Sequence, residues 1–174
     1  MIVFQTFNQT HNIENIHKKE YYNYELDKTN DGDISAVDKG INYGGEEKEE
    51  FTSLLDAGCG PAPMISLLAE KYPNRHYTGL DLTPAMIEQA KKKNIPNADF
   101  VVGDCENFPF SENTFDAIIC SNSFHHYPNP QAFFNSVKRC LRPGGRLILS
   151  NERKIYFMVQ CGLTGNHRDK RSFS

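Results

Sequence analysis

The chain has 174 residues, of which 39% are hydrophobic and 24% charged, so it is long enough for one domain with a buried core. Its formal net charge of -3 gives no reason to expect a nucleic acid or an anionic membrane as a partner. No segment approaches the roughly 20 apolar residues of a membrane span, and no secretory signal is seen. The five cysteines lack C-x-x-C spacing, which predicts reduced thiols in a cytoplasmic protein and no metal site.

Residues 1–52 are polar, rich in Asn, Asp, Glu and Lys, and show no sustained apolar period. We expect an N-terminal arm or linker that is partly disordered, because such a composition buries little surface. An alternative is that the aromatic cluster of Tyr21, Tyr22 and Tyr24 folds over a substrate pocket. Residues 151–174 are predicted to form a short tail, in which 155–159 are apolar enough for a further strand or helical turn.

Residues 53–150 alternate short apolar runs with helical patterns, which is typical of βαβ units. Thr83 is predicted to cap a helix that has Pro84 at its first position, and Pro143-Gly144-Gly145 is predicted to stop the last helix. The alternation predicts an α/β fold with a doubly wound, mostly parallel sheet. The predicted strands are 53–56, 76–81, 100–103, 115–120 and 146–150, and the predicted helices are 62–72, 84–93 and 130–141.

The first of these strands runs into a glycine-rich turn, Asp56-Ala57-Gly58-Cys59-Gly60, which a helix follows at once. Glycines let the backbone approach a ligand closely, and the helix N-terminus offers unpaired N–H groups. The turn therefore predicts a nucleotide-like ligand at the carboxyl end of a parallel strand. Pro63 occupies the third small position of the dinucleotide fingerprint G-x-G-x-x-G, which argues against NAD. Asp56 instead suits a ligand with a cationic amine, such as S-adenosylmethionine.

Two further acidic residues follow the next predicted strands. Asp81 ends the second strand and can accept hydrogen bonds from both hydroxyls of a ribose, because Thr83 is expected to cap the next helix and leave Asp81 free. Asp104 follows the third strand and can accept from an adenine amino group, while the backbone N–H of Cys105 can donate to a ring nitrogen. The alternative for Asp104 is a turn residue with no ligand.

Five motifs occur in order and at family-like spacing: LLDAGCGPA, GLDLTPAMIEQAK, ADFVVGDCENFPF, FDAIICSNSFHHY and LRPGGRLIL. With them, residues 54–149 resemble the class I S-adenosylmethionine-dependent methyltransferases of the broad type 11 group, which have a Rossmann-like fold. The resemblance implies S-adenosyl-L-methionine as the cofactor and methyl transfer to a small-molecule acceptor. A different outcome is a cofactor-binding remnant without independent catalysis.

The resemblance also implies roles for single residues. His125 and His126 follow the fourth strand, where the acceptor would arrive, so they are candidate general bases. We favour the alternative that one of them packs under the loop while the other is solvated. Phe110, Phe124 and Tyr127 are predicted to shape an apolar acceptor wall. The cofactor positions are Asp56, Gly58 and Gly60 at the methionine end, Asp81, Leu82 and Met86 at the adenosine, Asp104 and Cys105 at the adenine, and Ser121 near the sulfonium.

The family usually ends with a helix and a β-hairpin, whereas 24 residues follow Ser150 in this chain. We therefore expect incomplete C-terminal strands and an open sheet edge along 146–150. Exposed apolar edges recruit other chains, so this edge predicts self-association. Residues 155–159 could relieve the edge in part by pairing as a substitute strand.

Overall fold

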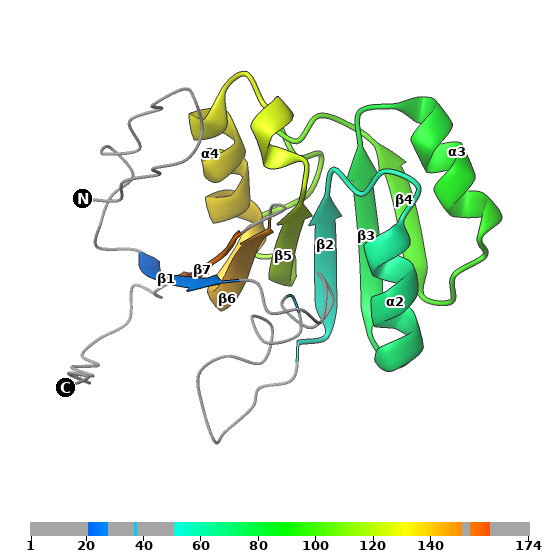
Figure 1. Cartoon of the computed structure of the whole chain (residues 1–174), viewed down its shortest axis with the longest axis horizontal. Helices are drawn as coiled ribbons and strands as arrows, with labels where there is room; N and C mark the ends of the chain where they lie inside the picture. Colours follow the sequence, from blue (N-terminus) through cyan, green and yellow to red (C-terminus); the bar gives the residue numbers. More distant parts are fainter. Residues whose placement is uncertain (1–20, 28–36, 38–50, 151–153, 161–174) are drawn as a thin grey trace.

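A computed structural model of the chain describes residues 21–27, 37, 51–150 and 154–160. Within these residues the strands form one seven-stranded sheet in the order β1-β7-β6-β5-β2-β3-β4 (Figure 1). The strands are β1 (Tyr21–Asp27), β2 (Ser53–Ala57), β3 (His76–Asp81), β4 (Ala98–Val102), β5 (Phe115–Ser121), β6 (Leu141–Ser150) and β7 (Lys154–Gln160). The helices are α2 (Pro63–Lys71), α3 (Pro84–Lys92) and α4 (Pro130–Cys140), with a short 3-10 helix η1 at Phe124–His126.

The five strands β2 to β6 are parallel to one another, and helices cover both faces of this part of the sheet. α2 and α3 pack on one face, where Ile65 and Ile87 join a cluster with Leu54 of β2. α4 packs on the other face, where Phe133 joins a second cluster with Leu55 of β2. Successive residues of a strand point to opposite faces, so β2 supplies both cores. The predicted doubly wound α/β fold is confirmed.

The sheet continues beyond β6, which corrects the prediction of an open edge. β7 pairs antiparallel with β6 from Arg146 to Ser150, so 155–159 do form the substitute strand. β1 then pairs antiparallel with β7, so the tyrosine cluster of residues 21–24 lies in an edge strand of the sheet, and its place over a substrate pocket stays a prediction. The prediction of self-association rested on an open edge at β6, which β7 covers. Self-association through another surface stays a prediction. No helix in the described part of the chain is long and apolar enough to cross a membrane.

β6 begins at Leu141, five residues before the predicted start of this strand. Leu141 pairs with Phe115 of β5, and the ladder then resumes at Ala117 and Arg146 after an irregularity. The extra residues include Gly144, whose φ of 80° lies in the left-handed region that favours glycine. Pro143-Gly144-Gly145 therefore does end α4, but it also forms an irregular segment within the strand.

The carboxyl group of Asp116 joins the beginnings of β2, β5 and β6. Its Oδ2 accepts hydrogen bonds from the backbone N–H groups of Thr52 at 2.9 Å and Ser53 at 3.0 Å. Its Oδ1 accepts from the Arg142 guanidinium at 2.6 Å. Burial by itself would raise the pKa of Asp116, but these hydrogen bonds together lower it to about 2.

We expect Asp116→Ala to lower the free energy of unfolding by about 1–3 kcal/mol at pH 7, because two N–H groups and a guanidinium lose their acceptor. The pKa of Asp116 is lower in the folded protein than its ordinary value of 3.8. This stabilisation is therefore complete above that value and is lost as the pH falls toward about 2. Urea unfolding of both proteins at pH 7 and pH 3 should show a smaller difference at pH 3. An equal difference at the two pH values would contradict this assignment.

Candidate functional site

The glycine turn between β2 and α2 lies at the carboxyl edge of the sheet. The N–H groups of Gly58 and Cys59 both donate to the Leu80 carbonyl, at 2.8 and 3.0 Å, which fixes the turn to the end of β3. Gly58 and Gly60 have φ values of 78° and 54°, in the left-handed region. A Cβ atom added at Gly60 would meet no heavy atom within 4 Å, so the backbone is open to a ligand at this position.

The other glycine of the turn packs tightly on the loop that follows β5. A Cβ atom on Gly58 would lie 2.3 Å from Ser123 Oγ and 2.9 Å from the Tyr127 hydroxyl oxygen. Both hydroxyl groups donate to the Ala57 carbonyl, Ser123 at 2.9 Å and Tyr127 at 3.2 Å. This support was not predictable from the sequence, because no local pattern links residue 57 to residues 123 and 127.

The Tyr127 ring contacts Phe124 and Phe133, and it contributes to the core between the sheet and α4. Phe124 and Tyr127 are both half-buried, and their place in an acceptor wall stays a prediction. The neighbouring thiols of Cys59, Cys105 and Cys120 are buried, and burial raises the pKa of Cys120 to about 11. These three cysteines thus serve as packing residues.

We expect Gly58→Ala to destabilise the protein by about 1–3 kcal/mol, because it strains a left-handed position and drives a methyl group into Ser123. Gly60→Ala is the matched control, since it carries the same backbone strain but has open space for the methyl group. Thermal unfolding of both variants should show the larger loss for Gly58→Ala. Equal losses would mean that the contact with Ser123 is not tight.

Asp56 lies in β2 just before the glycine turn, and its side chain is 2% exposed. Among the described residues, no hydrogen bond reaches its carboxyl group. Burial, and to a smaller extent the negative charge of Asp81, raises the pKa of Asp56 to about 7. A buried carboxyl group of this kind can ionise fully when a cation is placed beside it.

Asp81 ends β3 and is not free, contrary to the prediction. Its Oδ2 accepts from the Gly60 N–H at 2.9 Å, and its Oδ1 accepts from the Thr83 N–H at 2.8 Å. The Thr83 side chain makes no capping hydrogen bond, so the Asp81 carboxylate, and not Thr83, accepts the hydrogen bond at the start of α3. Each carboxylate oxygen has a second lone pair, so Asp81 can still accept from two hydroxyl groups.

The remaining adenosine positions lie at the ends of β3 and β4. Leu82 is 68% exposed, and Val102, which the sequence analysis missed, is 48% exposed. Asp104 is exposed and accepts from the Glu106 N–H at 2.8 Å, so it does form the turn of the alternative interpretation. Met86 is half-buried, and Cys105 is buried. Val102 is the register partner of Asp81, which Leu82 follows directly, so two exposed apolar residues lie at these neighbouring strand ends.

Past β5, the structure places the histidine pair on the surface. His125 and His126 lie in η1, both are exposed, and their ring centroids are 3.8 Å apart. The expectation that one ring packs under the loop is therefore wrong. Ser121 is half-buried at the end of β5, and it lies on the same face of the sheet as Asp56 because both alternate with residues of the α4-side core.

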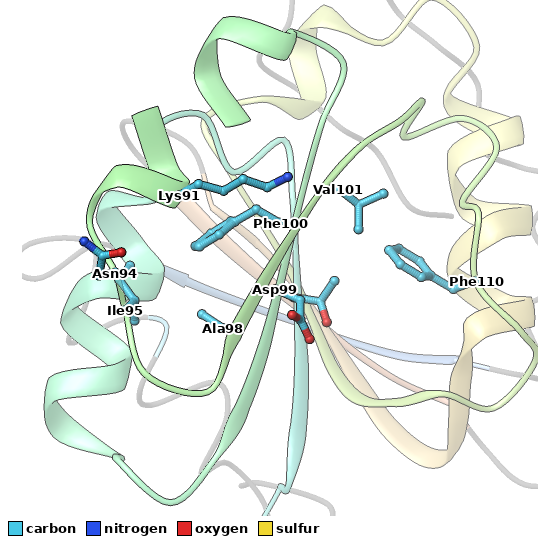
Figure 2. A pocket seen from close by; sticks show the side chains of 9 residues that line it. Lys91, Asn94, Ile95, Ala98, Asp99, Phe100, Val101 and Phe110 are labelled. Atoms are coloured by element: carbon cyan, nitrogen blue, oxygen red, sulfur yellow. The ribbon is translucent and has the colours of Figure 1, made fainter. Parts of the chain in front are cut away.

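A cavity of about 810 Å³ lies along the outer edge of β4, away from these residues (Figure 2). Lys91 of α3 lies on one side of it with Asn94 and Ile95, which follow this helix, and Phe110 lies on the other side (Figure 2). None of the predicted cofactor residues lines this cavity. Phe110, predicted to shape the acceptor wall, belongs to this edge instead.

Residues 55–149, more than half of the chain, match the sequence profile of a family described as a methyltransferase domain. The chain belongs to this family. The resemblance to class I S-adenosylmethionine-dependent methyltransferases is thereby confirmed.

Individual relatives of this methyltransferase domain agree. It is 40% identical over 101 residues to a phthiotriol/phenolphthiotriol dimycocerosates methyltransferase of Mycobacterium leprae, covering 58% of this chain and 37% of that protein. It is 37% identical over 108 residues to a fatty-acid O-methyltransferase of Mycolicibacterium smegmatis, covering 62% and 39%. The chain therefore spans about two fifths of the length of these curated relatives.

Solved structures of other proteins share the fold. The plantazolicin methyltransferase BpumL, crystallised with a substrate analogue and SAH, superposes with a TM-score of 0.61 at 26% identity, covering 68% of this chain and 46% of that one. The YcgJ protein of Bacillus subtilis gives a TM-score of 0.56 at 28% identity, covering 67% and 48%.

Proposed function

We propose that this methyltransferase domain binds S-adenosylmethionine across the carboxyl ends of β2, β3 and β4. The observation that carries the proposal is the buried carboxyl group of Asp56, which has no hydrogen bond from a described residue and stands beside the open backbone at Gly60. A cationic amine fits this position, a ribose fits Asp81, and an adenine fits between the exposed Leu82 and Val102. When bound, the cofactor supplies a methyl group on a sulfonium, which is electrophilic without further activation.

The residues of the chain then bind and orient. Asp56 would hold the amine, while Asp81 keeps the glycine turn in place through Gly60 and accepts from the ribose. Much of the rate of an in-line displacement can come from holding the two reactants at the right distance and angle. The carboxyl end of β5 lies next to that of β2, and β6 lies beyond it in the sheet, so the acceptor would approach over Ser121.

For the acceptor, we infer a small molecule that joins an oxygen nucleophile to a long apolar part. This inference is supported by the names of two relatives, a fatty-acid O-methyltransferase and a methyltransferase of phthiotriol and phenolphthiotriol dimycocerosates. A carboxylate acceptor would need no general base, whereas a hydroxyl acceptor would have to lose a proton. His125 and His126 would therefore matter only for a hydroxyl acceptor.

Two measurements test this function. Calorimetric titration should show binding of S-adenosylhomocysteine and no binding of NAD. Transfer of a radiolabelled methyl group from S-adenosylmethionine should then be measured with a series of fatty acids and fatty alcohols. We expect labelled ester from the acids. Binding of S-adenosylhomocysteine without transfer to any member of the series would instead favour a cofactor-binding remnant.

We expect His125→Ala and His126→Ala to leave the affinity for S-adenosylhomocysteine at its wild-type value, because both are exposed in η1 after β5, whereas the cofactor is proposed to bind at the ends of β2, β3 and β4. With a fatty-acid acceptor, turnover should also stay close to that of the wild type. A fall of about 10²–10⁴-fold in turnover alone would identify a general base. Loss of cofactor binding in both variants would show that this loop contacts the cofactor.

A further inference from the structure

Ser150, the last residue of β6, carries a buried hydroxyl group without a partner. The residue is 4% exposed, and Ser150 Oγ is the one side-chain oxygen or nitrogen atom in the described part of the chain that is fully closed to solvent and makes no hydrogen bond. Its backbone is well fixed, because its carbonyl accepts from the Asn122 N–H at 2.8 Å. Buried hydroxyl groups nearly always have a partner, so this one indicates a group that the protein binds.

The position of Ser150 relates it to the proposed cofactor site. Leu147 and Leu149 of β6 belong to the core under α4, so the alternation of a strand turns Ser150 to the other face, on which α2 packs. Asp56 of β2 and Ser121 of β5 lie on this same face. Ser121 is the register partner of Ser150, and Asp56 is the register partner of Ile119, two residues earlier on β5.

Asp56, Ser121 and Ser150 thus form a polar row that crosses three neighbouring strands at the carboxyl edge. Neighbouring strands are about 4.8 Å apart, so β6 lies about 10 Å from β2. With the adenosine over β3 and β4 and the amine at Asp56, the far end of the row is the side that remains for the acceptor.

We propose that the Ser150 hydroxyl binds the oxygen-bearing end of the methyl acceptor, an inference that rests on the proposed function. A serine hydroxyl can donate to one oxygen of a carboxylate, and it can also accept from an alcohol. Held in this way, a carboxylate would keep its second oxygen turned toward the cofactor. Ser150 then contributes to the choice of an oxygen acceptor.

The test compares Ser150→Ala with Ser150→Thr, which keeps the hydroxyl group. Ser66→Ala is the matched control, because Ser66 lies on α2 and donates to the Ala62 carbonyl at 2.7 Å. Binding of the fluorescent fatty acid dansylundecanoic acid to the full chain saturated with S-adenosylhomocysteine is the first measurement. We expect about tenfold weaker binding by Ser150→Ala, the scale of one hydrogen bond to a charged group. Ser150→Thr and Ser66→Ala should stay close to the wild type.

Two further measurements separate a ligand contact from a structural role. S-adenosylhomocysteine should bind Ser150→Ala as tightly as it binds the wild type. The thermal midpoint of Ser150→Ala without ligands should not fall, because the hydroxyl group that it lacks has no partner to lose. A lower midpoint together with unchanged probe binding would overturn the proposal and give Ser150 a structural role.

Failure of this inference is distinguishable from failure of the proposed function. If the wild type binds the probe and Ser150→Ala binds it weakly, but no methyl group is transferred, the contact stands and the function is wrong. If the wild type methylates fatty acids and Ser150→Ala has the same KM for them, the function stands and the contact is wrong. A wild type that does not bind the probe overturns the contact.

Discussion

Replacing Asp81 with Ala should weaken the binding of S-adenosylhomocysteine by about 10- to 150-fold, the range expected when hydrogen bonds to a charged group are lost. The variant loses the acceptor proposed for the ribose. It also releases the Gly60 and Thr83 N–H groups, which hold the glycine turn and the start of α3. Calorimetric titration of the wild type and the variant at one pH and one salt concentration measures the difference.

Two controls separate these contributions. Asp81→Asn keeps one carbonyl oxygen, so it should retain one backbone contact and lose less affinity than Asp81→Ala. Asp99→Ala removes an exposed carboxylate from the outer edge of the same sheet, where it pairs with His76 at 3.2 Å, and should leave the affinity unchanged. Wild-type affinity in Asp81→Ala would refute the ribose assignment and leave Asp81 as a structural residue of the turn.

The parallel part of the fold was predictable because each strand and helix has its own local pattern. The apolar runs at 76–81 and 115–120 are buried on both faces, and their ends agree with β3 and β5 within a residue. β1 was not predictable in this way, since Tyr21–Asp27 lies in a polar segment and pairs only with the remote β7. A strand at the edge of a sheet depends on its partner more than on its own composition.

The candidate site was predictable where a residue follows directly from a strand end, as Asp56 and Asp81 do. The residues that were missed depend on contacts across the fold. Ser123 and Tyr127 matter because they meet the Ala57 carbonyl, and Val102 is distinctive only through its exposure. The cap of α3 was misassigned because Thr83 and Asp81 both suit that role, and only the geometry decides that the carboxylate of Asp81 fills it.

The two carboxylates differ in what surrounds them, and this difference assigns them different tasks. Asp81 accepts two backbone hydrogen bonds, whereas Asp56 is buried and receives none from the described residues. The negative charge of Asp81 also adds to the rise in the pKa of Asp56. The glycine turn thus holds one carboxylate by two backbone hydrogen bonds at the position proposed for the ribose, and a second, buried one that becomes charged when an amine arrives.

The affinity for S-adenosylhomocysteine should therefore depend on pH. With a pKa of about 7, Asp56 is mostly neutral at pH 5 in the ligand-free protein, and it must lose its proton to pair with the amine. Affinity should rise by up to about tenfold per pH unit below pH 7 and level off above it. Asp56→Asn cannot ionise, so its affinity should be low and should not change between pH 5 and pH 8.

The stability of the ligand-free protein should change with pH in the opposite direction to the affinity, which gives an independent check on Asp56. Its pKa is raised in the folded protein from 3.8 to about 7, so the folded state holds this proton more tightly than the unfolded chain does. Stability without ligand should therefore fall as the pH rises through this window, by at most about 4 kcal/mol, since one pKa unit corresponds to about 1.4 kcal/mol. Asp56→Asn should remove this fall and be the more stable protein at pH 8. If urea unfolding at pH 5 and pH 8 shows the same pH dependence for both proteins, Asp56 is already ionised without ligand, and the pH-dependent binding must come from another group.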